Sequence, residues 1–264
     1  MNAQRIVIVT GAGTGIGKAT AKRLMEQDWR VFATLRRPDP TGDGPDALAL
    51  DVTSDDSVAA AVAEVLKRTG RIDAIVNNAG LDILGAAEET TSREAEALFQ
   101  TNFFGVHRLI RAVLPTMRAQ GAGHIVTVGS MAGFLPTPFD AFYCASKHAL
   151  EGYMETLANE IAPFGIRCVL VEPGFIKTEL RSKKTDVAAH IDAYAARRAQ
   201  VGDTFNNNVN RGLSPDRVAD VIVRALRDDR PKLRQRVGSD ANMLAFVRRY
   251  MPNFVFQMGL SRQF

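Results

Sequence analysis

The chain has 264 residues, of which 46% are hydrophobic and 23% are charged. This composition excludes a largely disordered chain, and a doubly wound α/β sheet of this length can bury its core within one domain. The net charge of +4 allows a nucleic-acid partner, but no nucleic-acid-binding motif accompanies it. A mildly basic enzyme with an anionic cofactor is therefore the favoured interpretation.

We expect no targeting or membrane-spanning segment in this sequence. No apolar run approaches the ~20 residues that cross a bilayer, and residues 1–5 lead directly into the first expected strand, unlike a signal peptide. Cys144 and Cys168 lie in apolar surroundings and form no C-x-x-C motif, which is typical of reduced core residues. We expect a cytoplasmic protein with no membrane span and no nucleic-acid partner.

Apolar runs and helical patterns alternate along the chain. In the first half of the chain we expect a strand at 6–9, a glycine-rich turn and helix to about 28, strands at 30–35 and 47–50, a helix from 54 to about 70 and a strand at 74–76. In the second half we expect a helix over 92–120, a strand at 125–128, a helix from 140 to about 164 and a strand at 168–171. A helix from 214 and a strand at 233–237 follow. Pro115 predicts a kink or a split in the helix over 92–120. This alternation predicts a single-domain α/β fold covering residues 1–264: a Rossmann-like doubly wound parallel sheet of about seven strands, with helices on both faces.

Two later segments have less regular patterns. Residues 175–213 are polar and partly helical, and we expect them to cover the substrate. Residues 240–264 are expected to form a C-terminal helix and tail. The basic, aromatic stretch at 246–256 could touch a membrane surface or complete a neighbouring subunit's site, but packing against its own domain is the favoured interpretation.

A glycine-rich turn follows the first expected strand. Residues 10–17 read Thr-Gly-Ala-Gly-Thr-Gly-Ile-Gly, with a G-x-x-x-G-x-G spacing that differs from the usual G-x-G-x-x-G dinucleotide fingerprint. Glycines let the backbone approach a pyrophosphate, whose charge is met by the helix N-terminus. A turn without a ligand is the alternative. We expect a cofactor site built from Gly11, Gly13, Thr14, Gly15, Ile16 and Gly17.

The end of the second strand indicates which dinucleotide is bound. Arg36 and Arg37 stand there, and a guanidinium suits the extra 2′-phosphate of NADP. Asp39 comes too late in the chain to reach the ribose. We therefore expect NADP(H) to be favoured over NAD(H), although two solvated arginines on a loop would look the same in sequence.

Two further strand ends carry expected cofactor contacts. Asp51 and Val52 follow the third strand, and the Asp51 carboxylate could accept from the adenine amino group or cap the next helix; spacing alone leaves both open. Asn78, Ala79 and Gly80 follow the fourth strand, where small and amide side chains leave room for a cofactor.

Tyr143 and Lys147 lie four residues apart and share one face of an expected helix. A nearby ammonium lowers the pKa of a phenol, so Lys147 would prepare Tyr143 for proton transfer, and it could also bind the nicotinamide ribose. Ser130 could hydrogen-bond the substrate oxygen, and Asn102 could hold a water that links Lys147 to solvent. Each residue alone has an ordinary explanation, but together they predict a catalytic site.

The sequence resembles the short-chain dehydrogenase/reductase family in its compact single-domain form. The matching positions follow the family's order and are Thr10, Gly11, Gly15, Gly17, Asn77–Gly80, Asn102, Ser130, Tyr143, Lys147, Pro173 and Gly174. The resemblance implies a catalytic tetrad of Asn102, Ser130, Tyr143 and Lys147, with no metal. It also implies that Pro173, Gly174, Ile176 and Thr178 close over the nicotinamide.

The resemblance further implies a homodimer or homotetramer, assembled through the helices at 92–120 and 140–164. Residues 33–36 and 143–152 look like the branch that holds 17β-hydroxysteroid and retinol dehydrogenases. A lipophilic, steroid- or retinoid-like small-molecule substrate is therefore expected.

The expected substrate site joins Ser130 and Tyr143 to Phe134 and Phe139, which could line an apolar pocket or pack in the core. The leading hypothesis is an NADP(H)-dependent oxidoreductase that interconverts an alcohol and a ketone or aldehyde. A 3-oxoacyl-thioester reductase is the alternative among enzymes. An NADP(H)-sensing regulator without turnover is the third hypothesis, and the complete tetrad argues against it.

Overall fold

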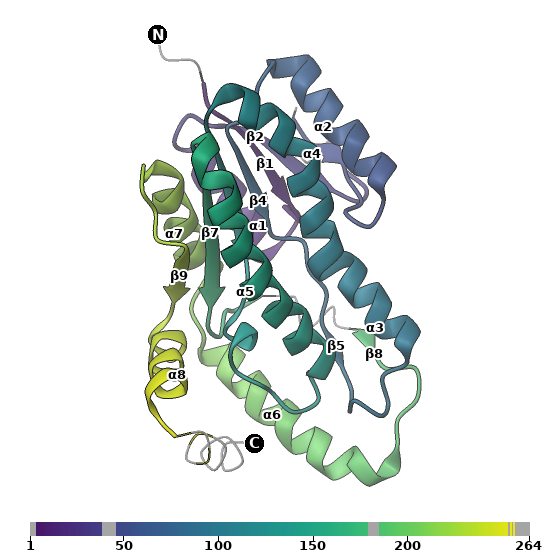
Figure 1. Cartoon of the computed structure of the whole chain (residues 1–264). Helices are drawn as coiled ribbons and strands as arrows, with labels where there is room; N and C mark the ends of the chain where they lie inside the picture. The colour runs from purple at the N-terminus through teal and green to yellow at the C-terminus, as the bar shows by residue number, and fades with distance from the viewer. Residues whose placement is uncertain (1–3, 39–45, 179–184, 253, 255, 257–264) are drawn as a thin grey trace.

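A computed structural model describes residues 4–38, 46–178, 185–252, 254 and 256 (Figure 1). Asp39 and residues 257–264 of the expected tail lie outside this described part of the chain. The remaining residues form one α/β unit in which a central sheet is flanked by helices, as Figure 1 shows.

A seven-stranded parallel sheet has the order β3-β2-β1-β4-β6-β7-β9. Its strands are β1 (Ile6–Thr10), β2 (Arg30–Leu35), β3 (Leu48–Ala49), β4 (Ala74–Asn77), β6 (Gly123–Val128), β7 (Ile166–Pro173) and β9 (Arg234–Val237). All five residues of β1 are buried, which explains its continuous apolar run. The strand order reverses between β1 and β4, so the ligand-binding crevice of such a sheet is expected there. The predicted doubly wound fold is confirmed.

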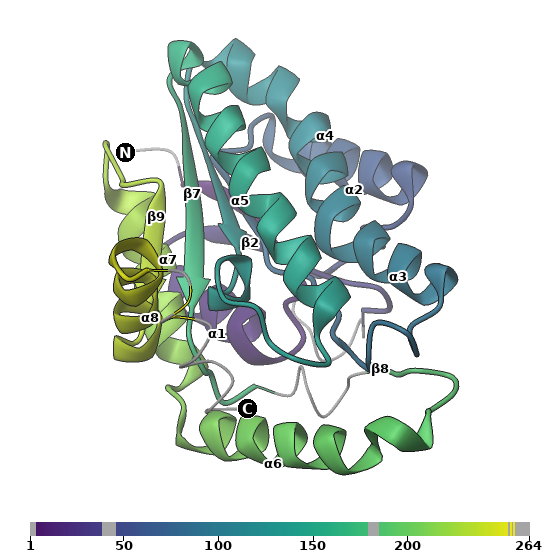
Figure 2. The same ribbon diagram turned by 60° about the horizontal axis from the view of Figure 1, so that its bottom comes forward.

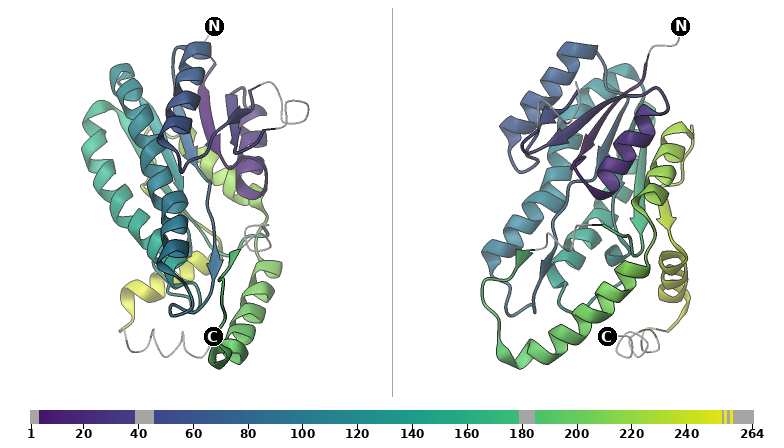
Figure 3. Two further views of the ribbon diagram at one scale, coloured as in Figure 1. Left: turned by 90° about the vertical axis from the view of Figure 1, so that its right-hand side faces the viewer. Right: turned by 180° about the vertical axis from the view of Figure 1, so that it is seen from behind.

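Helices cover both faces of the sheet (Figure 3). The helices are α1 (Gly15–Met25), α2 (Asp55–Thr69), α3 (Ser92–Phe99), α4 (Gly105–Gln120), α5 (Ala141–Ile161) and α7 (Pro215–Arg227). Leu24 of α1 and Ile222 of α7 pack against Val7 and Val126 on one face. On the other face, α2, α4 and α5 bury their apolar sides in a second cluster that includes Leu109 and Leu150.

Local capping sets the helix boundaries that the sequence predicts. The Ser54 hydroxyl accepts a hydrogen bond of 3.2 Å from Ser57 N, and Gly70 ends α2 with a φ of 69°. Gly165 similarly has a φ of 72° and follows the short helix η3 (Ala162–Phe164) at the end of α5. These two turns need the left-handed backbone conformation that glycine adopts without steric cost.

The prediction that the helix over 92–120 kinks or splits near Pro115 is wrong about the place of the irregularity. Pro115 lies inside α4, whereas the irregular turn is the π-helical segment η1 (Gln100–Phe104), which joins α3 to α4. A π turn inserts an extra residue into the helix, and such turns are frequent at functional sites. The hydrogen bonds of Asn102, described below, give the physical reason for its place.

The described parts of the segment from 175 to 213, residues 175–178 and 185–213, have more regular structure than the sequence pattern predicts. They contain the short strand β8 (Thr185–Asp186), which pairs with β5 (Ile83–Leu84), the turn η4 (Asp192–Tyr194) and the helix α6 (Ala195–Arg211). Figure 2 shows α6 crossing the end of the molecule where the strands of the sheet terminate. At its base, Leu213 N donates to Phe175 O at 3.0 Å, and Lys177 N donates to Leu213 O at 2.9 Å.

The C-terminal helix α8 (Ser239–Tyr250) follows β9 directly. Ala241 is fully buried, and Leu244 and Val247 pack with Met131 and Leu135. Phe256 joins the same cluster and is 4% exposed. Phe256 and the inner side of α8 therefore pack on their own domain, whereas Phe246, Tyr250 and Phe254 are exposed.

Candidate active site

A cavity of about 910 Å³ lies where the sheet's strands end. Its wall combines the turn after β1, the ends of β2, β3 and β4, the segment after β6, one face of α5, the segment after β7 and part of α6. Of the expected cofactor residues, those on this wall are Gly11, Gly13, Thr14, Gly15, Ile16, Arg36, Asp51, Val52, Asn78, Ala79, Gly80, Tyr143, Lys147, Pro173, Gly174, Ile176 and Thr178. Gly17 and Arg37 do not line it.

The glycine turn is packed too closely for side chains. A Cβ atom on Gly11 would lie 3.0 Å from Ala79 Cα, and one on Gly17 would overlap Gly11 O and the Asn78 amide. Thr10 Oγ1 accepts from Asn78 N at 2.9 Å and Ala79 N at 3.0 Å, which ties the ends of β1 and β4 together. Gly17 does not line the cavity, but its lack of a side chain therefore lets the turn pack closely against Gly11 and Asn78.

The start of α1 suits an anionic ligand. Its first turn carries no acidic residue, and the described contacts include no cap hydrogen bond from the Thr14 side chain. Backbone N–H groups at such a helix start, together with the helix dipole, favour negative charge. These features fit the pyrophosphate of a dinucleotide held against Gly13–Ile16.

The sequence left Asp51 two possible roles, an adenine contact or a cap for the next helix, and the structure gives the cap of α2 to Ser54. The Asp51 carboxylate accepts from Thr53 N at 2.9 Å and from Thr53 Oγ1 at 2.7 Å, so it orders the turn before α2. These hydrogen bonds, and the charges of Arg36 and Arg108, lower the pKa of Asp51. The residue also lines the cavity beside Arg36, which is exposed at the end of β2.

Tyr143 and Lys147 reach the cavity from the same face of α5. The Lys147 ammonium lies 5.7 Å from the centre of the Tyr143 ring and donates a hydrogen bond of 2.9 Å to Val128 O. Burial lowers the pKa of Lys147 to about 8, although the charge of Asp82 opposes this shift. Lys147 is thus a buried ammonium group that loses its proton more readily than an exposed lysine does.

The pKa of Tyr143 departs from the sequence-based expectation. Burial and the charges of Asp82 and Asp140 raise it, and a hydrogen bond with Ser130 opposes the rise. The lowering of the Tyr143 pKa that Lys147 was expected to cause is outweighed. The free-energy cost of taking the phenolate out of water exceeds the stabilisation that neighbouring groups give it. The phenol is therefore held in its protonated form.

Asn102 joins two elements beside this pair. Its side chain accepts from Leu81 N at 2.8 Å and donates to Leu81 O at 2.9 Å and to Ser146 Oγ at 3.2 Å. Ser146 in turn donates to Tyr143 O at 2.7 Å. The π turn η1 thus connects the loop after β4 to the backbone of α5 next to Lys147.

Ser130 precedes the short helix η2 (Met131–Gly133), and its hydroxyl accepts a hydrogen bond of 3.1 Å from Ala132 N. It lines the cavity next to Tyr143. Three members of the expected tetrad therefore face the cavity, and Asn102 stands behind them.

The substrate end of the cavity differs from the sequence-based expectation. Phe134 and Phe139 are not among the lining residues, because Phe134 packs in the cluster under α8 and the Phe139 ring contacts Tyr194, with centroids 6.2 Å apart. Lining side chains that sequence reasoning missed include Asp82, Thr137 and Asp140, while Phe175, Phe205 and Val209 come from the segment expected to cover the substrate but were not singled out. Val201, Phe205 and Val209 are spaced four residues apart, and this helical period is the signal that could have revealed the inner face of α6.

Glu89 fastens the segment before α6 to the body of the protein. Its buried carboxylate accepts from Ala86 N at 2.8 Å and Ile191 N at 2.7 Å, and it forms an ion pair with Arg198 of α6. Burial alone would raise the pKa of Glu89, but these hydrogen bonds and the Arg198 charge lower it to about 2. Two other acids act nearby: Glu94 accepts from Ala188 N, and Glu88 accepts from the Tyr194 hydroxyl.

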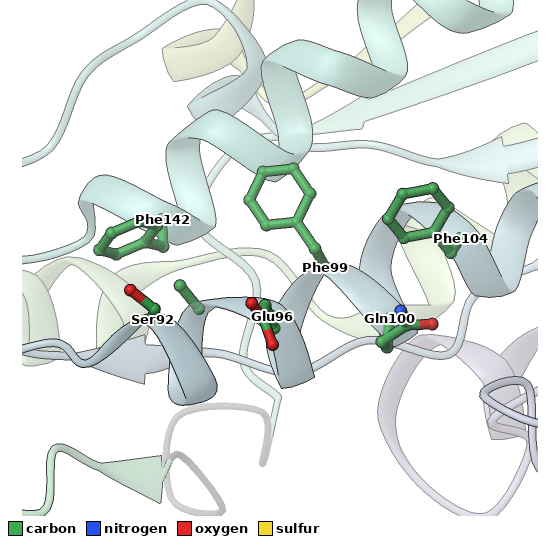
Figure 4. A pocket seen from close by; sticks show the side chains of 7 residues that line it. Ser92, Glu96, Phe99, Gln100, Phe104 and Phe142 are labelled. Atoms are coloured by element: carbon green, nitrogen blue, oxygen red, sulfur yellow. The ribbon is translucent and has the colours of Figure 1, made fainter.

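A second, smaller hollow of about 340 Å³ lies on the surface between α3, η1 and α5. Figure 4 shows Phe99, Phe104 and Phe142 around it, with Ser92, Glu96 and Gln100 along the opposite side. The Phe104 ring is 43% exposed. This hollow lies on the helices that the family resemblance assigned to subunit contacts.

In the described part of the chain, no group of three or more His, Cys, Asp or Glu side chains is placed to hold a metal ion. None of the helices in these same residues combines the length and the apolar character needed to cross a bilayer.

Comparison with known proteins identifies the family. Residues 5–188 match the family model described as short chain dehydrogenase. The chain belongs to the short-chain dehydrogenase/reductase family. It is 34% identical to 3-ketodihydrosphingosine reductase of Bacteroides thetaiotaomicron, with 97% of this chain and 96% of that protein covered. It is also 34% identical to retinol dehydrogenase 8 of Bos taurus (90% and 83% covered) and to 17-beta-hydroxysteroid dehydrogenase type 1 of Homo sapiens (88% and 77% covered).

Solved structures agree with this assignment. A short-chain dehydrogenase from Streptomyces avermitilis superimposes with a TM-score of 0.82 at 36% identity, covering 98% of each chain. A Burkholderia phymatum relative in complex with NAD has a TM-score of 0.80 at 26% identity (96% and 95% covered). A Burkholderia cenocepacia relative in complex with NADP has a TM-score of 0.77 at 25% identity and covers 97% of each chain. The protein is an NAD(P)-dependent oxidoreductase that acts on CH–OH groups.

Proposed function

We propose that this short-chain dehydrogenase/reductase interconverts a lipophilic alcohol and its ketone or aldehyde, uses NADP(H), and exchanges a proton through Tyr143. The observation that carries the proposal is the convergence of Tyr143, Lys147 and Ser130 on the cavity that also contains the glycine turn. The bound nicotinamide would supply a hydride to the substrate carbon in reduction and accept one in oxidation.

The protein's own groups handle the proton and the charge on oxygen. In reduction, Tyr143 donates its proton to the carbonyl oxygen, and its raised pKa keeps the phenol protonated at neutral pH. Ser130 donates a hydrogen bond to the same oxygen. Lys147 holds a positive charge beside the developing phenolate, and Asn102 positions α5 through Ser146. In oxidation, Tyr143 takes the proton back.

Arg36 supports the choice of NADP(H). It lines the cavity at the end of β2, where the ribose of a dinucleotide bound to this fold would lie, and its guanidinium suits a 2′-phosphate. Asp51 on the neighbouring strand would then face the adenine end. Relatives crystallised with NAD and with NADP both exist, so the preference for NADP(H) is our proposal for this chain.

A lipophilic substrate fits the apolar part of the wall. Leu81, Met131, Phe175, Phe205 and Val209 line the same cavity as Tyr143, and the Phe175 and Phe205 rings meet edge to face with centroids 5.1 Å apart. The proposed cover, residues 175–213, brings three of these side chains over the reacting groups. The apolar wall would bind the carbon skeleton, while Ser130 and Tyr143 orient the oxygen.

An amino ketone is a second candidate substrate. The carboxylates of Asp82 and Asp140 line the cavity, are 4% and 2% exposed, and raise the pKa of Tyr143 through their charge. A cationic or hydroxylated group next to the carbonyl would interact favourably with them. The 3-ketodihydrosphingosine named in one relative is an aliphatic amino ketone.

A spectrophotometric screen of NADPH oxidation tests both candidates. The panel contains steroid, retinoid, quinone, oxoacyl-thioester and long-chain amino ketone substrates, and each is repeated with NADH. Turnover of lipophilic ketones with NADPH is expected. Activity confined to oxoacyl thioesters would replace the proposal with the thioester reductase, and preference for amino ketones that disappears in Asp82→Asn would select the second candidate.

We also propose that the enzyme forms a homodimer or homotetramer through the helices at 92–120 (α3, η1 and α4) and at 140–164 (α5 and η3). The apolar hollow around Phe104 and Phe142 supports this assembly, since such a surface gains stability when a partner covers it. Sedimentation velocity should give a mass above 28.8 kDa, and Phe104→Asp should shift it toward the monomer.

A further inference from the structure

The outer face of α8 is apolar and exposed. We define it by Met243, Phe246, Arg249 and Tyr250, followed by Phe254 beyond the helix. Met243, Phe246 and Tyr250 recur at helical spacing and are 60%, 64% and 66% exposed, and Phe254 is 73% exposed. A run of large apolar side chains this accessible on one helix face is typical of a surface that meets a partner.

The exposure of this face is fixed by the fold. The opposite side of α8 packs through Ala241, Leu244 and Val247 on the segment after Ser130. At the helix start, the Asp240 carboxylate accepts a hydrogen bond of 2.8 Å from Phe175 N. Because α8 is held from its inner side, the outer face cannot turn inward without breaking this cluster.

Charge favours a negatively charged partner. Arg248 and Arg249 are exposed, and no acidic residue follows Asp240 to the end of the chain. Tyrosine, phenylalanine and methionine beside arginine on one helix match an interfacial helix, whose apolar side chains enter the headgroup boundary while cations meet anionic lipids. A second copy fits less well, because a symmetric contact through this face would bring arginines against arginines.

We propose that the outer face of α8 docks this enzyme on an anionic lipid surface. Figures 1 and 3 show α8 and α6 toward the same end of the molecule. The strand ends and α6 contribute to the wall of the cavity. The contact would therefore bring the substrate entrance toward the lipid phase. Docking itself does not depend on the proposed substrate, whereas delivery of a lipophilic ketone from the membrane rests on the proposed function.

Vesicle co-sedimentation of the full chain tests the proposal. Vesicles of phosphatidylcholine with phosphatidylserine should sediment the protein, vesicles of phosphatidylcholine alone should sediment it less, and binding should weaken as salt is added. Met243→Ser and Phe246→Ser should each lose binding, and Arg249→Glu should weaken it about tenfold. Met25→Ser on α1, a methionine with 57% exposure, and Arg227→Glu on α7 are the matched controls and should bind like the wild type.

Two outcomes would overturn the proposal. One is wild-type protein that stays in the supernatant with phosphatidylserine vesicles. The other is vesicle binding by Met243→Ser and Phe246→Ser that equals the wild type, which would place the lipid contact elsewhere. If vesicle binding is absent and Phe246→Ser loses a concentration-dependent dimer, the face belongs to a second copy. Turnover of a short, water-soluble ketone should be unchanged in all these variants, so failure of the proposed function and failure of docking are separable.

Discussion

The side-chain nitrogen of Lys147 donates a hydrogen bond of 2.9 Å to the carbonyl oxygen of Val128, the last residue of β6. This contact holds an ammonium at the inner end of the cavity, where Lys147 is only 7% exposed. In the proposed mechanism, the cation beside Tyr143 is thus kept in a place where burial opposes ionisation of Lys147. Function and stability place opposite demands on this side chain.

Lys147→Met should abolish activity and stabilise the fold. Burial lowers the folded-state pKa of Lys147 from 10.5 to about 8, so below pH 8 the folded protein bears the full cost of a buried charge. We expect the free energy of unfolding to rise by roughly 1–3 kcal/mol in the variant at about pH 7. The gain should shrink as pH rises from 8 to 10.5, because the wild-type lysine then becomes neutral in the folded state. Urea denaturation at several pH values measures it.

A variant that is less stable than the wild type at neutral pH would show that packing and the Val128 hydrogen bond outweigh the cost of the charge. Lys147→Arg is a useful control, because it keeps the cation and should show no such gain.

Tyr143→Phe should lower kcat by about 10²–10⁴-fold, the usual contribution of a positioned proton-transfer group. Cofactor affinity, measured by fluorescence titration with NADPH, should change little, since the ring remains on the cavity wall. This pair of results would separate an enzyme from a regulator that only senses the cofactor. Turnover that survives the substitution would refute the proposed mechanism.

Arg36→Ala should weaken NADPH binding by roughly 10–100-fold, the loss expected for hydrogen bonds to a charged group. NADH has no 2′-phosphate, so its affinity should stay nearly constant. Arg37→Ala is the matched control, because Arg37 is equally basic but does not line the cavity. Equal effects of Arg36→Ala on both cofactors would contradict the assignment of NADP(H).

Glu89→Gln should raise the KM for substrate several-fold and leave NADPH affinity unchanged. The substitution removes the charge that pairs with Arg198 and so loosens the segment that carries α6. The low pKa of Glu89, about 2, means that this anchor gains its full strength above pH 4.5 and is lost as pH falls toward 2. Limited proteolysis should find new cleavage near Ile191 in the variant.

Glu88→Gln controls for a general change of surface charge. Glu88 is a neighbouring acid that bonds only the Tyr194 hydroxyl among the described contacts, so its effect on KM should be small. If both variants raised KM equally, the anchor would belong to the acidic stretch as a whole rather than to Glu89.

The sequence predicts those structural elements that are determined by residues close to one another in the chain. Buried strands such as β1 appear as continuous apolar runs, and Ser54 and Gly70 mark the ends of α2 by their own chemistry. The glycine turn and the pair Tyr143 and Lys147 are short motifs on single elements, so their convergence follows once the parallel sheet is predicted.

Other features depend on contacts between distant segments. The π turn at Asn102 exists because its amide meets Leu81, and no local pattern marks that partner. Phe134 and Phe139 lie in sequence between Ser130 and Tyr143, but they pack against α8 and Tyr194 and do not line the cavity. The strands β5 and β8 have two residues each, too few for a periodic signal.

The two hydrogen bonds between Leu213 and the backbone at Phe175 and Lys177 have an evolutionary consequence. They join the two ends of the segment from 175 to 213, the proposed cover, so the chain enters and leaves this segment at one place near the edge of the sheet. Insertions, deletions or a complete exchange of this segment need not disturb the register of β7 or β9. A lineage could therefore change its substrate by replacing this one segment, while the proposed proton-transfer residues and the glycine turn are inherited unchanged.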